Sequence, residues 1–118
     1  MKHAYSRTRA KQLIPLLQSI SAEIEDRTLT VRRLERKLRS FGEDSTDPAV
    51  FDVRAELAEQ RRQLRLSRTE LEDLGCSVDE EDPRRVLIPG LGGTMVNGFC
   101  WELGDTTVLR LGESKQAA

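Results

Sequence analysis

Apolar residues recur at alternating intervals of three and four in two blocks of the chain, and this repeat constrains the fold more than any other feature. In the first block the repeat is carried by Leu13, Leu17, Ile20, Ile24, Val31, Leu34, Leu38 and Phe41. In the second block it is carried by Val50, Val53, Leu57, Leu64, Leu71 and Leu74. Such spacing is typical of a coiled-coil seam. We therefore predict two long helices, over residues 6–41 and 48–74.

The segment between the blocks has the composition of a short helix–helix connection. Gly42 suits the end of a first helix, and Asp47 followed by Pro48 suits the start of a second. If the helices are antiparallel, a register in which paired residue numbers sum to 91 superposes both seams and places Leu34 opposite Leu57. The sequence therefore predicts an antiparallel coiled-coil hairpin.

The charge distribution supports this hairpin. Residues 1–42 hold ten basic and four acidic side chains, whereas residues 43–83 hold five basic and thirteen acidic ones. The register also brings Glu35 near Arg54 and Lys37 near Glu56. Each exposed pair of this kind contributes less than about 1 kcal/mol, so the pairs select an orientation more than they stabilise it.

Proline and glycine subdivide the helical part. Ser6 is the expected N-cap of the first helix, and Pro15 is expected to kink that helix or to separate a short first segment from it. Gly75 is the expected end of the second helix. The acidic residues that follow, as far as Arg85, are expected to form a solvated loop.

The C-terminal third has the pattern of short strands. Residues 86–111 are predicted to form short strands and a β-hairpin, with Gly104-Asp105 as a two-residue turn that places Trp101 beside Val108. Residues 112–118 are expected to be a disordered tail. Taken together, residues 1–118 are predicted to form a single α+β domain, mainly α, in which the β-hairpin packs at or near the open end of the helical hairpin.

Three polar residues interrupt the predicted seam at Arg27, Gln60 and Ser67. We favour a partly hydrated layer that sets the helix register, as buried polar seam residues do in coiled coils. The functional alternative is a small polar pocket or a partner contact at these residues.

The remaining candidates lie on a helix flank and in the C-terminal strands. Arg61 belongs to a stripe with Arg54 and Arg68, which suggests contact with phosphates, although the intervening Glu residues favour a solvated, salt-bridged face. In the pair Cys100-Trp101, neighbouring strand residues point to opposite faces, so we expect one of the two to be buried. The sequence contains no pattern for catalytic, cofactor-binding or metal-binding residues.

The two ends of the chain resemble a known family. The opening Tyr5-Ser6 with Leu13-Ile14-Pro15-Leu16-Leu17, and the closing Phe99-Cys100-Trp101-Glu102-Leu103-Gly104-Asp105, are similar to the bacterial family catalogued as domain of unknown function 2203. The resemblance implies no established activity or catalytic residue.

We therefore expect a non-enzymatic interaction or scaffolding module that forms a homodimer and binds an unidentified protein partner. The alternatives are a small metal-binding protein or enzyme with a site near the β-hairpin, and a weak nucleic-acid binder that uses the arginine stripe. The net charge of -1 disfavours nucleic acid as the main partner. The absence of an apolar signal core or long apolar run predicts a cytoplasmic protein without membrane contact.

Overall fold

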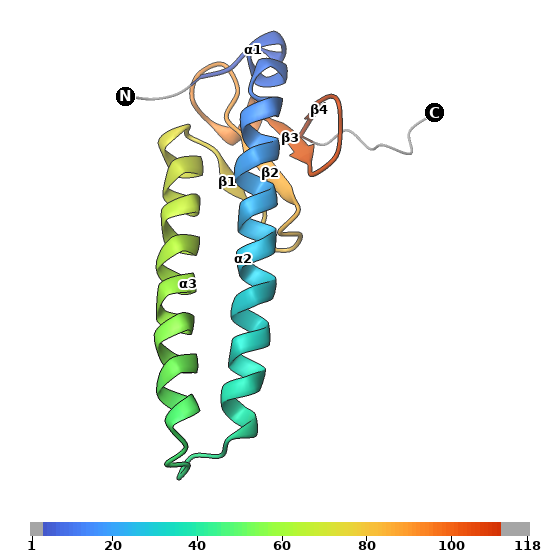
Figure 1. Cartoon of the computed structure of the whole chain (residues 1–118). Helices are drawn as coiled ribbons and strands as arrows, with labels where there is room; N and C mark the ends of the chain where they lie inside the picture. The colour runs from blue at the N-terminus through green and yellow to red at the C-terminus, as the bar shows by residue number, and fades with distance from the viewer. Residues whose placement is uncertain (1–3, 112–118) are drawn as a thin grey trace.

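Two long helices lie side by side, and a small sheet packs at the end where they are not connected (Figure 1). The computed structural model describes residues 4–111. Its elements in chain order are α1 (Arg7–Gln12), α2 (Ile14–Ser40), α3 (Pro48–Asp73), β1 (Ser77–Val78), β2 (Arg85–Ile88), the 3₁₀ turn η1 (Met95–Asn97), β3 (Phe99–Glu102) and β4 (Leu109–Arg110). The expected tail at 112–118 lies outside the described residues.

The helical region expected over residues 6–41 is divided at Leu13 into α1 and α2. Ser6 caps α1, and its side chain accepts a hydrogen bond of 3.2 Å from the Arg9 amide. Pro15 lies in the first turn of α2, where its missing N–H would have no helical partner in any case. The proline therefore begins a new helix instead of kinking a continuous one.

The connection between α2 and α3 uses the residues that the sequence indicated. Gly42 has a φ of 80°, a left-handed conformation that glycine adopts without a steric penalty. Asp47 caps α3 and accepts a hydrogen bond of 2.9 Å from the Ala49 amide. Near this loop Leu34, Val53 and Leu57 form a buried cluster, which agrees with a register that places Leu34 opposite Leu57.

The charged contacts across the helical hairpin differ from the expected ones. Glu35 forms an ion pair of 3.0 Å with Arg61, not with Arg54, and no ion pair joins Lys37 to Glu56 within residues 4–111. Long flexible side chains reach more than one residue on the facing helix, so the register of the seam does not determine which exposed charges meet.

The sheet has four antiparallel strands in the order β1-β2-β3-β4. The pair β3–β4 follows the predicted numbering, with Phe99 opposite Arg110 and Cys100 opposite Leu109. However, this ladder stops at Cys100 and Leu109, so residues 103–108 form a longer connection than the expected two-residue turn. The backbone partner of Trp101 is Val86 on β2.

Two features of the sheet were wrongly predicted. Asn97, expected to begin a strand of the β-hairpin, lies in η1, and the acidic segment expected as a loop contains β1. In the connection from β2 to β3, a Cβ atom at Gly90 would collide with the Asn97 carbonyl, and one at Gly98 would collide with the Ile88 carbonyl. The two glycines thus allow the ends of this connection to approach each other closely.

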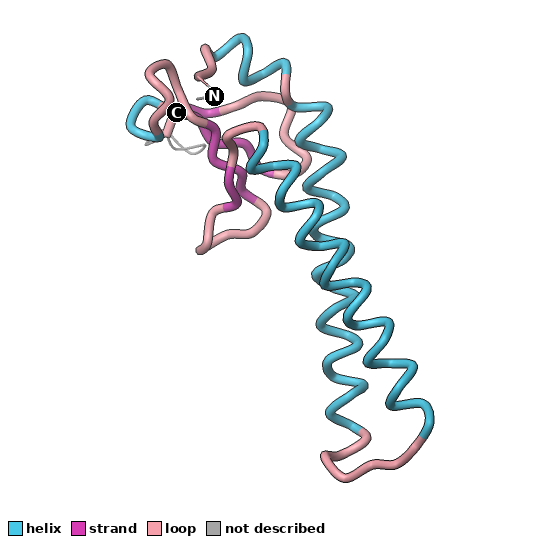
Figure 2. The backbone as a smooth tube through the Cα atoms, turned by 90° about the vertical axis from the view of Figure 1, so that its left-hand side faces the viewer, coloured by secondary structure: helices cyan, strands magenta, loops and turns pink. Residues whose placement is uncertain are grey.

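One face of the sheet packs on the open end of the helices (Figure 2). Val86, Ile88, Phe99 and Trp101 are buried and share this face because they are paired across β2 and β3. They join the apolar core of Leu17, Ile20, Ile24 and Leu71 from the helices. The predicted α+β class, a helical hairpin with a small C-terminal β element at its open end, is confirmed.

No helix within the described part of the chain is both long and apolar enough to span a membrane.

Candidate functional site

A polar pair crosses the helical hairpin between its two apolar clusters. Arg27 donates a hydrogen bond of 3.0 Å to the Gln60 side chain and a second of 3.1 Å to Glu23. The structure thus joins two of the three polar seam residues. Ser67, the third, is buried two helical turns further along α3.

Another polar side chain of the helical hairpin has no hydrogen-bond partner in the described part of the chain. Ser21 on α2 is buried, and its hydroxyl oxygen has no hydrogen-bond partner among residues 4–111. The pattern of apolar residues did not indicate this position because a single serine in an amphipathic helix is unremarkable in sequence. A buried unpartnered hydroxyl is unfavourable for stability.

The arginine stripe of α3 is partly neutralised. Arg61 is paired with Glu35, and its neighbour Arg62 forms an ion pair of 2.8 Å with Glu59. Hydrogen bonds from Arg62 and Gln63 lower the pKa of Glu59 to about 2. The stripe therefore presents carboxylates together with its cations, which weakens it as a phosphate-binding surface.

A more strongly basic surface lies on α2, near the loop. Its members are Arg32, Arg33, Arg36, Lys37 and Arg39, all exposed. None of them takes part in an ion pair within the described residues. We call these five residues the α2 basic cluster.

The sheet separates the two members of the pair Cys100-Trp101. Trp101 is buried and donates a hydrogen bond of 2.9 Å from its indole nitrogen to the Asp105 carbonyl, whereas Cys100 is half-buried. Cys76 is buried next to the end of α3, and burial raises its pKa to about 12. Because the thiolate is the reactive form, this raised pKa disfavours reaction of Cys76 at neutral pH.

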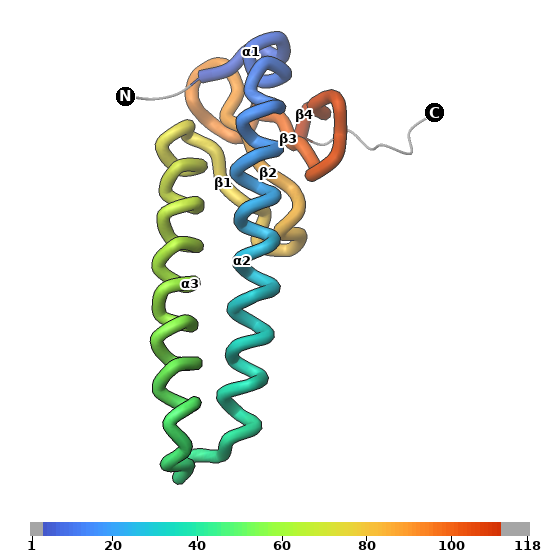
Figure 3. Tube along the Cα trace, in the orientation of Figure 1, coloured from blue at the N-terminus to red at the C-terminus, as the bar shows by residue number. Residues whose placement is uncertain are grey.

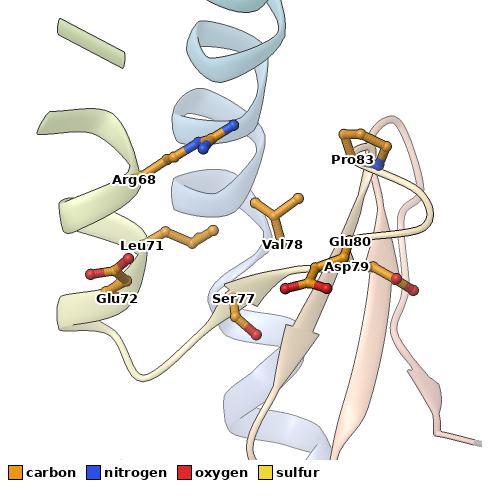
Figure 4. Close-up of a pocket in the computed structure, with 8 residues that line it drawn as sticks. All are labelled: Arg68, Leu71, Glu72, Ser77, Val78, Asp79, Glu80 and Pro83. Carbon is orange, nitrogen blue, oxygen red and sulfur yellow. The ribbon is translucent and has the colours of Figure 1, made fainter. Parts of the chain in front are cut away.

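A hollow of about 410 Å³ lies between the end of α3 and β1 (Figure 4). Leu71 and Val78 provide its apolar surface, and the charged groups around it are Arg68, Glu72, Asp79 and Glu80. Asp79 is in an ion pair of 3.8 Å with Arg85. Residues 4–111 contain no group of three or more His, Cys, Asp or Glu side chains placed to hold a metal ion.

A second hollow, of about 370 Å³, lies where α1 meets the sheet and is lined by basic side chains. Its two arginines are Arg7 and Arg110, from opposite ends of the described chain. The sequence carries no signal for this hollow, because neither arginine belongs to a motif and only the tertiary fold places both of them around it.

Exposed apolar side chains on the helices form the last candidate surface. On α3, Phe51 is 68% exposed, and Ala55 and Ala58 are also exposed. On α2, Leu29 is 57% exposed. Phe51, Ala55 and Ala58 share the side of α3 that faces away from the seam, because their spacing is four and three.

The chain was compared with protein families, curated proteins and solved structures. The profile of a family described as an uncharacterized conserved protein (DUF2203) matches residues 3–115. No curated protein and no solved structure matches the chain.

Proposed function

Since the chain belongs to the DUF2203 family, as its two ends suggested, and that family's description names no activity, we propose a function from the surface of the helical hairpin. The protein acts as a non-enzymatic interaction module that self-associates and presents its remaining surface to an unidentified protein partner. The observation that carries this proposal is the exposed apolar strip Phe51-Ala55-Ala58 on the outer side of α3.

The strip has the form of a second, shorter helix–helix seam. Phe51 provides a large apolar group, and Ala55 and Ala58 allow a second helix to approach closely. No other segment of the described chain covers this side of α3 (Figure 1). A soluble protein gains free energy when such a strip is covered, at about 25 cal/mol per Å² of apolar surface.

The charges beside the strip favour a second copy of this chain as its partner and also favour one relative direction of the two α3 helices. One flank of the strip is basic, with Arg54 and Arg61, and the other is acidic, with Asp52 and Glu59. Parallel helices bring opposite flanks together, whereas antiparallel helices bring like flanks together. In a parallel arrangement Arg54 of one copy faces Glu59 of the second copy, so we propose a dimer in which the two α3 helices run parallel.

Light scattering at micromolar concentration tests the dimer. The expected mass is twice 13.4 kDa. A sizing column alone is insufficient, because a chain measuring 55 × 36 × 22 Å elutes early even as a monomer. A mass of 13.4 kDa would overturn self-association.

Variants of α3 test the surface itself. Phe51→Lys is expected to give monomers, and Leu29→Lys, a matched change at an exposed apolar residue of α2, is expected to leave the dimer intact. Arg54→Glu is expected to weaken the dimer, and adding Glu59→Arg is expected to restore it because the charges are exchanged across the interface. A dimer that survives Phe51→Lys would place the interface elsewhere.

A second candidate function, nucleic-acid binding, is favoured by the α2 basic cluster and not by the stripe on α3. Five exposed cations that form no ion pair with a carboxylate of residues 4–111 suit a polyanion. Replacing Arg33, Arg36 and Lys37 by Gln together should abolish any salt-dependent shift of labelled RNA or DNA. Binding that persists in this triple variant would argue against the cluster.

We also propose a cytoplasmic location, supported by Cys76 and Cys100, which form no disulfide within residues 4–111, as is usual in a reducing compartment. The remaining alternative, a metal-binding protein or enzyme with a site near the sheet, would gain support if elemental analysis of the purified protein detected a stoichiometric metal.

A further inference from the structure

The first edge of the sheet borders the hollow beside β1. Strand β1 is first in the order β1-β2-β3-β4, and no further strand pairs with its other edge within residues 4–111. That edge lies next to α3, which contacts β1 (Figure 3). The hollow of about 410 Å³ lies between the two elements. The edge of β1 is thus open to a ligand within this hollow.

The register of β1 directs the backbone of one residue to the open edge. The Asp79 amide donates a hydrogen bond of 2.9 Å to the Arg85 carbonyl, so these two residues form a hydrogen-bonded pair. Hydrogen-bonded and non-hydrogen-bonded pairs alternate along antiparallel strands. Val78, which pairs with Val86, therefore directs its amide and its carbonyl away from β2. Neither of these two groups has a hydrogen-bond partner in the described part of the chain.

Apolar surface lies beside these backbone groups. The Val78 side chain is half-buried, and it and the Leu71 side chain of α3 point toward each other (Figure 4). Paired residues of neighbouring strands have their side chains on the same face of a sheet. A residue that pairs with Val78 from the open edge would thus place its side chain near Val78 and Leu71. An apolar side chain suits this position.

The border of the hollow is acidic. Residues 69–82 contain seven Asp and Glu side chains and no Lys, Arg or His. Asp79 is paired with Arg85, but Glu72 and Glu80 line the hollow, are exposed, and form no ion pair within residues 4–111. Arg68 is the cation that lines the hollow with them. The charge around the open edge therefore suits a basic ligand.

We propose that this hollow binds a short, extended, basic segment of a partner protein, which adds to β1 as a further strand. Such strand addition uses main-chain hydrogen bonds for affinity and side chains for specificity. The added strand runs antiparallel to β1, because antiparallel pairing is slightly more stable than parallel pairing. Its central apolar residue exchanges two main-chain hydrogen bonds with Val78, and Lys or Arg residues on either side approach Glu72 and Glu80.

This inference rests on the proposed interaction with a protein partner and names the chemistry of that partner. It does not depend on self-association, because the strip Phe51-Ala55-Ala58 lies near the loop, at the other end of α3 (Figure 1).

Titration of the full-length, ¹⁵N-labelled protein with the capped peptide Lys-Arg-Val-Arg-Lys tests the proposal. Amide shifts are expected to concentrate at Ser77, Val78 and Asp79. At saturating peptide, hydrogen exchange of the Val78 amide should slow by at least about tenfold, because this N–H becomes a donor to the peptide. The Asp79 amide already donates to Arg85, so its exchange rate should change less.

Two control peptides separate strand addition from general attraction to carboxylates. Methylation of the central valine nitrogen removes the N–H that would donate to the Val78 carbonyl and keeps every charge. This peptide should bind at least about tenfold more weakly. The acidic peptide Glu-Asp-Val-Asp-Glu should give no shifts at the same concentration.

Protein variants test the acidic border. Glu72→Gln and Glu80→Gln together should weaken the basic peptide at least about tenfold. Glu43→Gln and Asp44→Asn together remove the same charge from the loop between α2 and α3, and should change affinity less than about twofold. All four residues are exposed, so the variants should fold, and far-UV circular dichroism checks this.

Three results would overturn the proposal. They are no shift at millimolar basic peptide, equal affinity for the methylated and unmethylated peptides, and equal losses in the two double variants. The Phe51→Lys variant distinguishes this failure from failure of self-association, because it should bind the basic peptide as tightly as the unchanged protein does.

Discussion

Replacing Leu34 by alanine measures how strongly the packed seam holds the loop end of the helical hairpin. Leu34 is 3% exposed and packs with Val53 and Leu57. The change removes three carbon atoms, which at about 0.8 kcal/mol per buried carbon gives a transfer loss of about 2.4 kcal/mol. A cavity left by incomplete collapse adds to this loss, so the free energy of unfolding should fall by about 2 to 4 kcal/mol.

Urea unfolding followed by far-UV circular dichroism provides the measurement. Leu29→Ala is the matched control, because it makes the same change in the same helix at a residue that is 57% exposed. This control should cost less than about 0.5 kcal/mol. Equal losses for Leu34→Ala and Leu29→Ala would show that the seam does not bury Leu34 and would refute the packing argument.

A double-mutant cycle then tests the register. Leu34 and Leu57 belong to one buried cluster, so the double variant should differ from the sum of the single losses by at least about 0.5 kcal/mol. Leu34 and Leu71 belong to separate clusters, and their losses should add. Additive losses for Leu34 and Leu57 would mean that the two side chains do not meet.

Three further perturbations have definite expected outcomes. Tyr5→Phe should lower the free energy of unfolding by about 1 kcal/mol, because it removes the hydrogen bond to the end of α3; an unchanged urea midpoint would contradict this. Ser21→Ala should leave the protein at least as stable in urea, because alanine favours helix and the buried hydroxyl has no partner within residues 4–111; a loss above about 1 kcal/mol would reveal a partner. At pH 8 a thiol reagent should modify Cys100 much faster than Cys76, whose pKa is raised to about 12 by burial. Because the pKa of Cys76 is higher in the folded state, protonated Cys76 stabilises the folded state fully below its ordinary pKa, near 8.5. This contribution to the free energy of unfolding is lost as pH rises towards 12, so alkaline unfolding should begin in this window. In Cys76→Ala the alkaline unfolding should move to higher pH.

Some contacts of the candidate residues could be predicted from the sequence, and others could not. Arg27 and Gln60 were expected near each other because both occupy seam positions, and the structure joins them by a hydrogen bond. The expected pairing of Glu35 with Arg54 was wrong because exposed side chains choose among several neighbours of similar energy. The sequence pattern did not predict that Arg7 and Arg110 would both lie against the Phe99 ring.

The strands illustrate the same boundary. The stretch around Trp101 alternates in a way that predicts a strand, and its numbering relative to Leu109 and Arg110 agrees with the structure. The strand β1 has two residues and depends on pairing with β2, so no local pattern could reveal it. A two-residue strand forms only where the rest of the fold already supplies its partner.

The sequence by itself determined the two long helices, their antiparallel connection and the face that each buries. These features depend on interactions between residues a few positions apart, such as the three- and four-residue spacing of apolar side chains and the caps at Ser6 and Asp47. Only the tertiary structure decided how the sheet docks, which exposed charges meet and that Arg7 and Arg110 both lie against the Phe99 ring. Those features depend on contacts between residues far apart in the chain, whose free energy exists only after the helices and the sheet have been brought together.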